Sequence, residues 1–591
     1  MHCKISDYSM IAIKSENTKR KVTMRMKKET LTGYPSIDKP WLKYYSQEAI
    51  DMQLTECTMY EYILNQNQDR IAIDYYDTKM SYGQMFQEIS YLAGTLESVG
   101  VKEGDIVTVC MMNSPQTICL VFALNKIGAV ANMVWGTSSC EELKKSITDT
   151  KSAIVFTIDS FQNKFEQLVD ETPLKQIVVA GFSKAIGSSE SKMDLKEIAF
   201  SKASKFIPWE HFFQCKRESQ KICSNADAAA VITYTGGTTG GAKGAVLSNK
   251  GIVVNAQQYV IGEHILRRGD TWAQVLPLHI AYGMTFSLMV PLSVGMTIIV
   301  RNVMEDSIAE LCQKFKPNHI AYGPAYWEAF ADDNKDIDLS CLISPITGGD
   351  ILNVAVEKKI NKYLEKQGSR SLLINGYGMT EANVVISVNY QHTHKYGSVG
   401  IPLVKNTVSA FDLETGKELK YGEQGEICIQ TPSMMKGYIN NQEETNNVIR
   451  QHDDGKLWLH SGDLGYITED GFVYISGRLK RYMLHIANGL HKKVFSLDIE
   501  KVLMNHPKVA KCAVVPMRDE VTFQVPAAYI ILKKEYHVDG DLEKELISYA
   551  ETNLQDGYRP RKYIFVDKFP LTKVGKIDYL ALERDVEERD E

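Results

Sequence analysis

Short apolar runs alternate with longer amphipathic stretches of helical period along the N-terminal part of the chain. The run "IAIDYY" at 71–76 combines β-branched and aromatic residues and predicts a strand. A helix is expected to begin at Ser81, where Gln84 completes a capping-box pattern, and to end at Gly100. This part of the chain is therefore predicted to fold as a strand followed by a helix.

The same alternation continues through "DIVTVCM" (105–111), "SPQTICLVFALNKIGAV" (114–130) and "AIVFTI" (153–158). These runs predict a strand, a helix and another strand. Strands that alternate with helices indicate mostly parallel sheets covered by helices. The sequence therefore predicts an α/β fold, with a large N-terminal domain of mostly parallel sheets flanked by helices.

A second, smaller pattern begins after Gly477. Helices are expected near 496–505 and 542–554, and strands at 510–517 and 527–534. The chain of 591 residues also exceeds what one hydrophobic core usually serves. The expected parts are a partly flexible N-terminal extension at 1–50, a large domain at 51–477 and a small α+β domain at 478–591.

One apolar stretch, 271–300, carries no formal charge over a length that would cross a bilayer. Pro277, Gly283, Pro291 and Gly295 interrupt it, and both residue types break helices. We interpret it as a buried strand end, a loop, a core helix and a further strand. No transmembrane segment is predicted.

The composition and charge narrow the range of partners. The formal net charge is -6, and no block of lysine and arginine interleaved with aromatic residues occurs in the body of the chain. Nucleic acid is therefore not expected as a partner. The eleven cysteines form no CxxC pair and no His/Cys cluster at zinc-ligand spacing, which is typical of reduced thiols in a cytosol. We expect a cytoplasmic protein without disulfides or a structural metal.

The first 31 residues are polar and basic, and they lack the apolar core of a secretory signal. Two explanations stay open. The segment is a flexible extension, or the start codon is placed too early, because Met26 begins a plausible protein.

The stretch "TYTGGTTGGAKGAVLSN" at 233–249 has the composition of a phosphate-binding loop. Glycine lets backbone N–H groups approach a ligand, threonine adds hydroxyl donors, and Lys243 supplies a point charge. Lys243 lies between Ala242 and Gly244, whereas a Walker A motif needs Ser or Thr after its lysine. The loop therefore differs from that of the common nucleotide triphosphatases.

Residues 234–244 of this loop resemble the signature "YTSGTTGxPKG" of the adenylate-forming superfamily, which includes acyl-CoA synthetases, adenylation domains and luciferases. Gly236 replaces the serine and Ala242 the proline. Four further motifs resemble those of the family in the same order. They are "NGYGMTEA" (375–382), "HSGDLG" (460–465), "GRLKR" (477–481) and "PLTKVGKID" (570–578). The resemblance, to the acyl-CoA synthetase type above all, extends from about residue 55 to about residue 585.

The resemblance implies a reaction in two halves. A carboxylate attacks the α-phosphate of ATP, pyrophosphate leaves, and the acyl group of the mixed anhydride then passes to the thiol of CoA. The resemblance thus implies ATP, Mg²⁺ and CoA as cofactors, and a fatty or aryl acid as the substrate. It also implies a large rotation of the small domain between the two half-reactions.

The resemblance assigns roles to individual residues. Thr238, Thr239 and Lys243 are expected to hold the β- and γ-phosphates, and Glu381 with Thr380 to bind Mg²⁺, because hard cations prefer oxygen ligands. The residues expected to bind ATP are Thr235, Gly236, Gly237, Thr238, Thr239, Gly240, Lys243, Asn375, Gly376, Tyr377, Gly378, Asp463 and Arg478. Within this set Tyr377 would stack on adenine, Asp463 would accept from the ribose hydroxyls, and Arg478 would reach the ribose or a phosphate.

Each of these residues also has an alternative, purely structural explanation. Lys243 could be a charge on a solvated turn, Glu381 a carboxylate stabilised at a helix start, and Tyr377 a core residue. The 461–465 segment could be a bare turn, and Arg478 a surface charge.

The small domain carries the expected catalytic lysine. The resemblance assigns Lys576 the bridge between the attacking carboxylate and the α-phosphate, and makes Lys480 the hinge, whereas Lys573 is expected to be solvated. Arg481 follows where the common motif has aspartate, the loop before Ser496 is about two residues longer than usual, and Ser496 replaces a common proline. These departures bear on the identity of the acyl acceptor more than on the adenylation step.

An acid pocket is expected around His279, which lies where acyl- and aryl-activating members often carry an aromatic residue or histidine, although a satisfied core histidine is equally plausible. The other residues predicted to line it are Tyr322, Gly348, Gly349 and Asp350. Aromatic residues at helical spacing, including Tyr326 and Trp327, are more often core. Asp350 could meet an amine or hydroxyl on the substrate.

Four functions remain open from the sequence. An acid:CoA ligase is favoured, because the chain ends shortly after Lys576 without a carrier domain. The alternatives are an acyl-AMP ligase that loads a separate carrier protein, a luciferase-like use of oxygen, and a silent binding protein. The last predicts loss of Glu381, Asp463 or Lys576, and all three are present.

Overall fold

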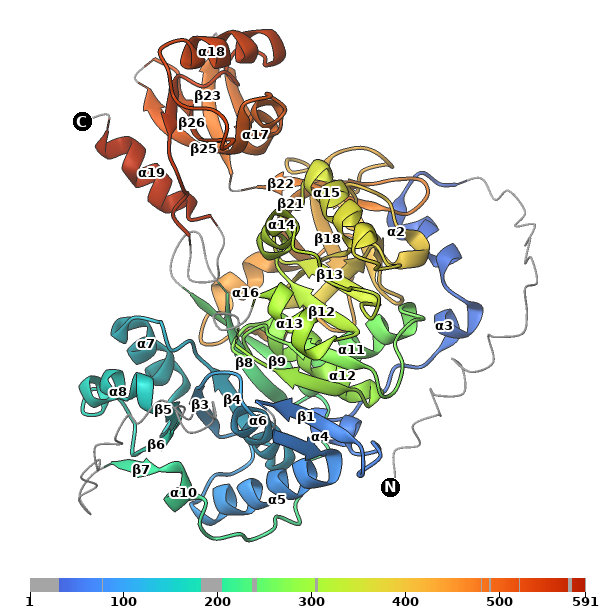
Figure 1. Cartoon of the computed structure of the whole chain (residues 1–591), viewed down its shortest axis with the longest axis vertical. Coiled ribbons are helices and arrows are strands. Elements are labelled where there is room, and N and C mark those ends of the chain that lie inside the picture. Colours follow the sequence, from blue (N-terminus) through green and yellow to red (C-terminus); the bar gives the residue numbers. More distant parts are fainter. Residues whose placement is uncertain are drawn as a thin grey trace. The chain divides into compact units, whose positions relative to one another are not determined.

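The computed structural model describes residues 31–76, 78–181, 205–235, 242–302, 307–479, 481–487, 490–519, 521–571 and 577–589 (Figure 1). Seven of the predicted site residues lie outside these ranges, namely Gly236, Gly237, Thr238, Thr239, Gly240, Lys480 and Lys576. The chain forms two compact units. The first comprises 1–409, 428–460 and 467–474, and the second comprises 410–427, 461–466 and 475–591. The predicted domain bounds at 50 and 477 stay a prediction.

An eight-stranded sheet in the first unit has the strand order β19-β9-β8-β4-β3-β5-β6-β7. Its strands are β3 (Ile106–Cys110), β4 (Val130–Met133), β5 (Ile154–Ile158), β6 (Gln176–Ala180), β7 (Phe206–Pro208), β8 (Ala229–Thr235), β9 (Lys243–Ser248) and β19 (Gly437–Tyr438). All pairs from β8 to β7 are parallel, whereas β9 is antiparallel to both β8 and β19. The predicted parallel α/β architecture is confirmed.

Helices accompany this sheet. They are α5 (Tyr82–Ser98), α6 (Pro115–Ile127), α7 (Cys140–Thr150), α8 (Gln162–Leu168), α10 (Trp209–Phe212) and α11 (Asn249–Gly262). Two of them, α5 and α6, begin where the sequence predicts a helix. Ser81 caps α5 in a capping box with Gln84, which satisfies N–H groups that the first turn leaves unpaired. Helix α6 is buried over nearly its whole length and ends at Gly128, whose φ of 83° suits glycine.

A nine-stranded sheet in the same unit has the order β16-β15-β14-β13-β12-β10-β11-β1-β2. Its strands are β1 (Ile71–Tyr75), β2 (Thr78–Ser81), β10 (Thr271–Gln274), β11 (Thr297–Val300), β12 (His319–Tyr322), β13 (Ser344–Gly348), β14 (Ile374–Met379), β15 (Val384–Val388) and β16 (Ile401–Pro402). The accompanying helices are the π-helix η4 (Tyr282–Leu288), α12 (Met289–Val294), α13 (Ile308–Phe315), α14 (Pro324–Asp333), α15 (Val354–Lys366) and the short η5 (Thr380–Ala382).

The apolar stretch 271–300 folds as β10, η4, α12 and β11, so its interpretation as core elements is confirmed. In the part of the chain that the structure describes, no helix has both the length and the apolar character needed to span a bilayer. Residues from η4 and α12 belong instead to the largest hydrophobic core.

Residues before β1 form α2 (Pro35–Asp38), η2 (Pro40–Tyr44), α3 (Gln47–Asp51) and α4 (Met59–Ile63). Trp41 is fully buried in the largest core cluster, so residues 31–50 include a segment that packs firmly on the first unit. The flexibility predicted for the extension stays a prediction.

A third sheet has the order β17-β18-β21-β20, with β22 paired to β21. Its elements are β17 (Thr407–Phe411), β18 (Gly425–Gln430), β20 (Ile449–Gln451), β21 (Leu457–Ile467) and β22 (Val473–Arg478), and α16 (Gln442–Val448) precedes β20. Strand β20 pairs antiparallel with the start of β21, which makes a hairpin over 449–459.

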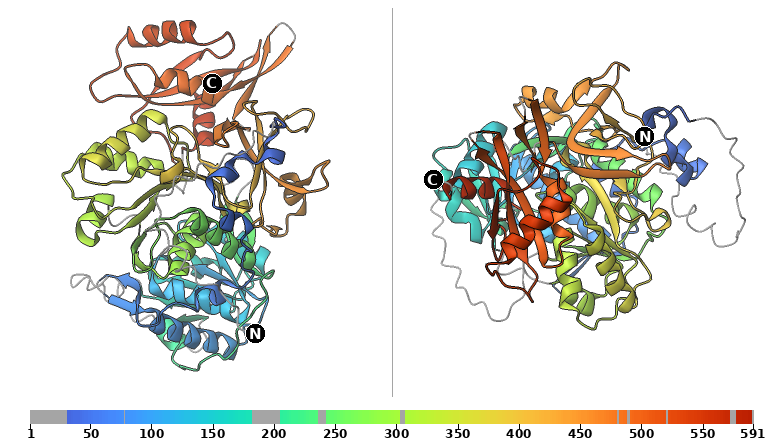
Figure 2. Two further views of the ribbon diagram at one scale, coloured as in Figure 1. Left: turned by 90° about the vertical axis from the view of Figure 1, so that its right-hand side faces the viewer. Right: turned by 90° about the horizontal axis from the view of Figure 1, so that it is seen from above.

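The C-terminal part of the second unit has a five-stranded sheet with its own core, coloured orange to red in Figures 1 and 2. It comprises β23 (Tyr482–Ala487), β24 (Leu490–Phe495), α17 (Ser496–Met504), β25 (Val509–Asp519), β26 (Phe523–Leu532), α18 (Leu542–Asn553), β27 (Lys562–Phe565) and α19 (Tyr579–Glu588). The predicted α+β pattern is confirmed, and the predicted mobility of this part stays a prediction.

Candidate active site

The segments that flank the glycine-rich loop form an antiparallel hairpin. Strand β8 ends at Thr235 and β9 begins at Lys243, and these two residues face each other in the register. The Thr235 hydroxyl donates to the Lys243 carbonyl at 3.4 Å. The sheet therefore fixes both ends of the predicted phosphate loop, and the lysine projects from the first residue of a strand.

Lys243 contacts a carboxylate. Its ammonium donates to Glu444 Oε2, and it lies 5.3 Å from the centre of the Tyr438 ring. The Lys243 side chain is 19% exposed and that of Glu444 is 35% exposed, so the ion pair is only partly screened by solvent. The group expected to meet phosphate oxygens thus already pairs with a carboxylate from the first turn of α16.

Glu381 lies in η5 and is 7% exposed. Its Oε1 accepts a hydrogen bond from the Tyr438 hydroxyl at 2.5 Å. Burial, and after it the Glu381 carboxylate, raises the pKa of Tyr438 above its ordinary value of 10.0. Tyr438 therefore stays protonated at neutral pH, donates to Glu381 and lies under the Lys243 ammonium.

Tyr438 and Glu444 were not among the residues predicted from the sequence. Tyr438 belongs to the two-residue strand β19, whose pairing places it opposite Ala245 of β9. A strand of two residues has no periodic signal, and its partner lies far away in the sequence. Only the folded chain brings this tyrosine between the predicted phosphate lysine and the predicted metal ligand.

The predicted adenine segment is strand β14, which pairs in parallel with β13. Gly376 faces Gly348 in the register, so a predicted nucleotide residue and a predicted acid-pocket residue are neighbours. At Gly378 the backbone lies so close to β15 that a Cβ would be 1.5 Å from the Val384 carbonyl oxygen. Only glycine fits between β14 and β15 at this position, which follows the partly exposed Tyr377.

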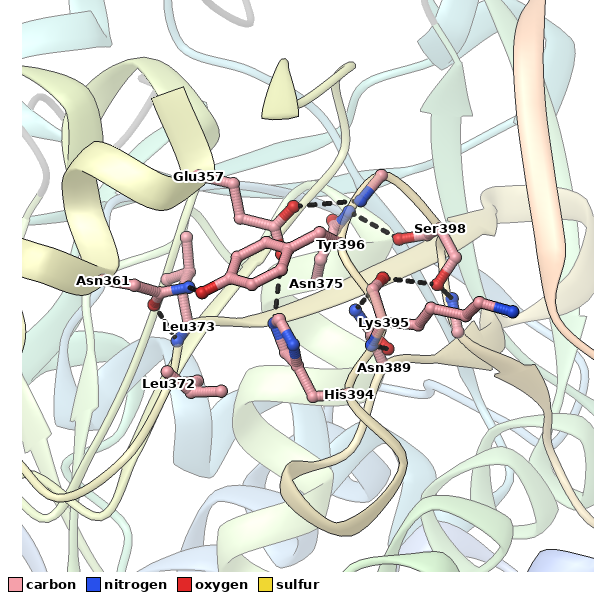
Figure 3. A network of polar contacts seen from close by, with 12 residues as sticks. Glu357, Asn361, Leu372, Leu373, Asn375, Asn389, His394, Lys395, Tyr396 and Ser398 are labelled. Atoms are coloured by element: carbon pink, nitrogen blue, oxygen red, sulfur yellow. Dashed lines mark hydrogen bonds and ion pairs between the residues drawn. The ribbon is translucent and has the colours of Figure 1, made fainter. Parts of the chain in front are cut away.

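A polar network supports β14 from the segment that follows β15 (Figure 3). His394 Nε2 contacts Glu357 Oε1 at 3.1 Å, and Glu357, on α15, is fully buried. The Ser398 hydroxyl donates to the Lys395 carbonyl at 2.8 Å, and the Asn375 amide donates to the Ser398 carbonyl at 3.3 Å. Asn375 therefore acts as a structural anchor of the predicted adenine strand.

His279 stacks on Trp135, with ring centres 4.9 Å apart and planes 22° apart. Burial lowers the pKa of His279 to about 4, so its imidazole is neutral at physiological pH. Within the described residues Nε2 of this ring is buried without a hydrogen-bond partner. The sequence did not identify Trp135, which lies on a loop after β4 without any periodic pattern.

Tyr282 lies three residues after His279, in η4. A Cβ added to Gly348 would be 3.6 Å from its hydroxyl, so η4 approaches the end of β13. This hydroxyl is also buried without a partner in the part of the chain that the structure describes. Two buried polar atoms, His279 Nε2 and the Tyr282 hydroxyl, thus lie near the predicted acid pocket with unused hydrogen-bonding capacity.

The other predicted pocket residues differ in their surroundings. Tyr322 is 1% exposed, belongs to a core cluster and lies with its ring centre 4.9 Å from that of Tyr326. Gly349 has φ of 89° and open space around it. Asp350 is exposed, and its carboxylate accepts from the Ile351 backbone N–H at 2.8 Å.

Asp463 and Arg478 form an ion pair within the second unit. Arg478 Nε lies 2.8 Å from Asp463 Oδ1, and the Asp463 side chain is only 6% exposed. The Leu479 N–H donates to the Gly462 carbonyl at 2.7 Å, which holds the end of β22 against this turn. The two residues that the sequence assigned to ribose are therefore together, with the arginine orienting the carboxylate.

Arg481 is the residue at which the sequence departs from the common hinge motif. Its side chain makes contacts within the second unit. Its Nη2 donates to Glu500 Oε1 at 2.5 Å, and its guanidinium lies 3.5 Å from the centre of the Tyr579 ring. Glu500 is 2% exposed. Arg481 therefore joins the N-terminal end of β23 to α17 and α19.

Comparison with known proteins supports the family resemblance over most of the chain. The family "AMP-binding enzyme" matches residues 60–439, and "AMP-binding enzyme C-terminal domain" matches residues 498–576. A long-chain-fatty-acid--CoA ligase from Bacillus subtilis is 27% identical over 561 residues, covering 91% of this chain and 96% of that protein. The 4-coumarate--CoA ligase CCL1 from Humulus lupulus is 29% identical, covering 82% of this chain and 85% of that protein.

Solved structures share the fold. An anthranilate CoA ligase AuaEII in complex with anthranoyl-AMP has a TM-score of 0.76 at 22% identity and covers 92% of this chain and 99% of its own. ATP-bound MatB from Rhodopseudomonas palustris has a TM-score of 0.78 at 22% identity, covering 90% and 99%. The family match spans more than half of the 591 residues. The chain is a member of the AMP-binding enzyme family, as its five motifs predicted.

Proposed function

We propose that this protein activates a fatty or aryl carboxylic acid with ATP, releases pyrophosphate, and passes the acyl group from the acyl-adenylate to the thiol of CoA. The observation that carries the proposal is the arrangement of Lys243, Tyr438 and Glu381. A cation beside the phosphate loop and a buried carboxylate contact the same tyrosine. This pairing suits a substrate whose phosphates need both a positive side chain and a metal ion.

Glu381 and Thr380 fit a magnesium ion, because both offer oxygen ligands and the Glu381 carboxylate is held in place by Tyr438. Mg²⁺ would neutralise charge on the phosphate oxygens. Lys243 and the glycine-rich loop would hold the same phosphates. Asp463, oriented by Arg478, would accept from the ribose hydroxyls.

The acid is expected to bind beside η4. The neutral His279 ring and the Tyr282 hydroxyl would supply hydrogen bonds to the carboxylate or to a polar ring substituent, and Trp135 would supply an aromatic face. Lys576 would then bridge the attacking carboxylate and the α-phosphate. The relatives named above act on a long-chain fatty acid and on 4-coumarate, which supports a fatty or aryl acid here.

The acceptor and the location complete the proposal. CoA is favoured over a carrier protein because the relatives named above are CoA ligases. The cysteines support a cytosolic location, since the ten in the described ranges form no disulfide with one another.

Mass spectrometry of single turnovers tests this function. The purified chain, Mg²⁺ and ATP are mixed with a panel of fatty, aryl and hydroxy acids, with and without CoA. We expect one class of acid to give acyl-AMP that becomes acyl-CoA on addition of CoA, and Lys576→Ala to lose mainly the first step. Acyl-AMP that accumulates and ignores CoA would favour a carrier protein. No acyl-AMP from any acid would overturn the proposal.

Glu444→Gln is expected to lower KM for ATP by about two- to fivefold. The carboxylate pairs with Lys243 and must be displaced by phosphate, and a partly exposed ion pair contributes about 0.2–1 kcal/mol. Initial rates at varied ATP measure the effect, with the exposed neighbour Glu443→Gln as the matched control. A higher KM in Glu444→Gln would show that Glu444 positions the lysine for ATP instead of competing with it.

His279→Gln is expected to raise KM for the acid about tenfold while KM for ATP stays unchanged, because the substitution removes the ring stacked on Trp135. With a pKa of about 4, wild-type His279 gains no charge between about pH 5.5 and pH 8. The wild-type and variant pH profiles of KM should therefore run parallel in this range. A step near pH 6.5 that only the wild type shows would contradict the neutral-ring assignment.

A further inference from the structure

Three side chains with metal-binding atoms meet in the first unit, and one of them, His460, is the first residue of the motif at 460–465. They are Cys428 in β18, His452 in the turn of the β20–β21 hairpin, and His460 in β21. One ligand atom from each lies within 4.8 Å of the others. The neighbouring strands β18 and β21 bring the cysteine and His460 together, and the hairpin returns His452 to the same place.

The distance between Cys428 and His460 suits tetrahedral coordination. Cys428 Sγ lies 3.5 Å from His460 Nδ1. A zinc ion with Zn–S of about 2.3 Å and Zn–N of about 2.1 Å separates these two atoms by about 3.6 Å. His452 Nε2 lies 2.9 Å from Nε2 of His460, which is the ring nitrogen opposite the one that faces Cys428, so the His452 side chain must turn toward Nδ1 to share a metal ion with both residues.

The surroundings hold His452 near this position. Its ring stacks on Trp458, with centres 5.5 Å apart and planes 23° apart. The indole N–H of Trp458 donates to the Asp454 carboxylate at 3.2 Å, and the backbone N–H of His452 donates to the Lys456 carbonyl at 3.1 Å. The turn fixes the backbone of His452 and Trp458 covers one face of its half-buried ring. The remaining freedom of the ring is rotation about its side-chain bonds.

We propose that Cys428, His452 and His460 bind a zinc ion, with water as the fourth ligand. The Cys428 thiol releases its proton to solvent when sulfur binds the metal. Thiolate and imidazole ligands select zinc over Mg²⁺, so this site is chemically distinct from the one at Glu381. His460 is three residues before Asp463 on the same strand, so the ion would stiffen β21 next to the proposed ribose ligand.

Cobalt spectroscopy tests the site on the full chain, treated with a chelator and dialysed. Co²⁺ in a tetrahedral site with a thiolate ligand gives visible d–d bands and a near-ultraviolet sulfur charge-transfer band, and Zn²⁺ should displace it. We expect one ion per chain. His452→Gln should weaken binding about 100-fold, and Cys428→Ser should remove the charge-transfer band. Cys341→Ser, at a thiol of the same unit outside the cluster, should change neither.

Circular dichroism and the thermal midpoint in the presence of chelator establish that the variants are folded. The partly exposed His452 is the safest substitution, since it removes a ligand from a turn and leaves both strands intact. A wild-type spectrum without the charge-transfer band, or a band that persists in Cys428→Ser, would overturn the site. This readout does not depend on ligase activity, so the proposed function can stand or fall separately.

Discussion

Glu381→Gln is expected to slow formation of the acyl-adenylate by about 10²–10³-fold, the typical effect of removing one group that stabilises charge in a transition state. The amide keeps the shape of the side chain and still accepts from the Tyr438 hydroxyl, which lies 2.5 Å from Oε1 in the wild type. It removes only the negative charge that a magnesium ion on the phosphates requires. Single-turnover acyl-AMP formation at saturating ATP measures the loss.

Two further variants distinguish the effect of the Glu381 charge from that of the Tyr438 hydroxyl that orients it. Tyr438→Phe deletes the hydroxyl that orients Glu381 and is expected to reduce the rate about tenfold or less. Glu443→Gln removes an exposed carboxylate from α16 and is expected to leave the rate unchanged. If Glu381→Gln kept the wild-type rate and the wild-type dependence on Mg²⁺, Glu381 would be merely the buried acceptor of Tyr438.

Much of the fold could be predicted because its signals are local. Ser81 and Gln84 are three residues apart, and the N-terminal capping box they form is decided within one turn. The apolar runs at 105–111 and 153–158 are followed by helical periods, which is enough to predict parallel strands. Prolines and glycines within 271–300 were equally decisive, because they divide an apolar stretch into core elements.

In the candidate site, too, the features with local sequence signals could be predicted and the others could not. Lys243, Glu381 and Asp463 are predictable because each lies in a short motif with a recognisable composition. Their functional roles, like those of the residues outside the described ranges, remain predictions. Folding adds what the motifs cannot show, which is how each residue is held. Asp463 is oriented by Arg478, and Asn375 serves as an anchor for β14.

Contacts between distant segments could not be predicted. Tyr438 reaches Lys243 and Glu381 through a two-residue strand, and Trp135 meets His279 across the unit. The Cys428 cluster has no zinc-ligand spacing along the chain, since its cysteine is 32 residues from His460. Such contacts depend on strand order, and strand order is a property of the folded sheets.

Stability of the first unit is expected to fall as pH rises from 5 to 8, because Glu263 is buried as a carboxylic acid. Glu263 is 3% exposed, and within the described residues its Oε2 has no hydrogen-bond partner. Burial raises the pKa of this carboxyl from 4.5 to about 8. The buried hydroxyls of Tyr259 and Tyr390 are among its neighbours, and burial raises their pKa well above 10.0. Neither tyrosine supplies a compensating positive charge.

The direction of this pH dependence follows from which state, folded or unfolded, binds the proton. Below the unfolded-state value of 4.5 both states hold the proton and the native state bears no penalty. Between 4.5 and about 8 only the folded state keeps it, so each pH unit costs about 1.4 kcal/mol, or roughly 3 kcal/mol by pH 7. Above about pH 8 the folded state ionises too and the loss stops growing.

Glu263→Gln should therefore flatten the pH dependence, because its side chain stays neutral in both states. Unfolding midpoints from scanning fluorimetry at pH 5, 6, 7 and 8 measure this, and the variant is expected to gain a few degrees over the wild type at pH 8 relative to pH 5. The exposed Glu48→Gln is the matched control and should follow the wild type. Since the amide needs new hydrogen-bond partners, its absolute stability is a weaker test than the slope. Parallel curves for wild type and Glu263→Gln would mean that the carboxyl is ionised inside the folded protein with a partner that compensates its charge.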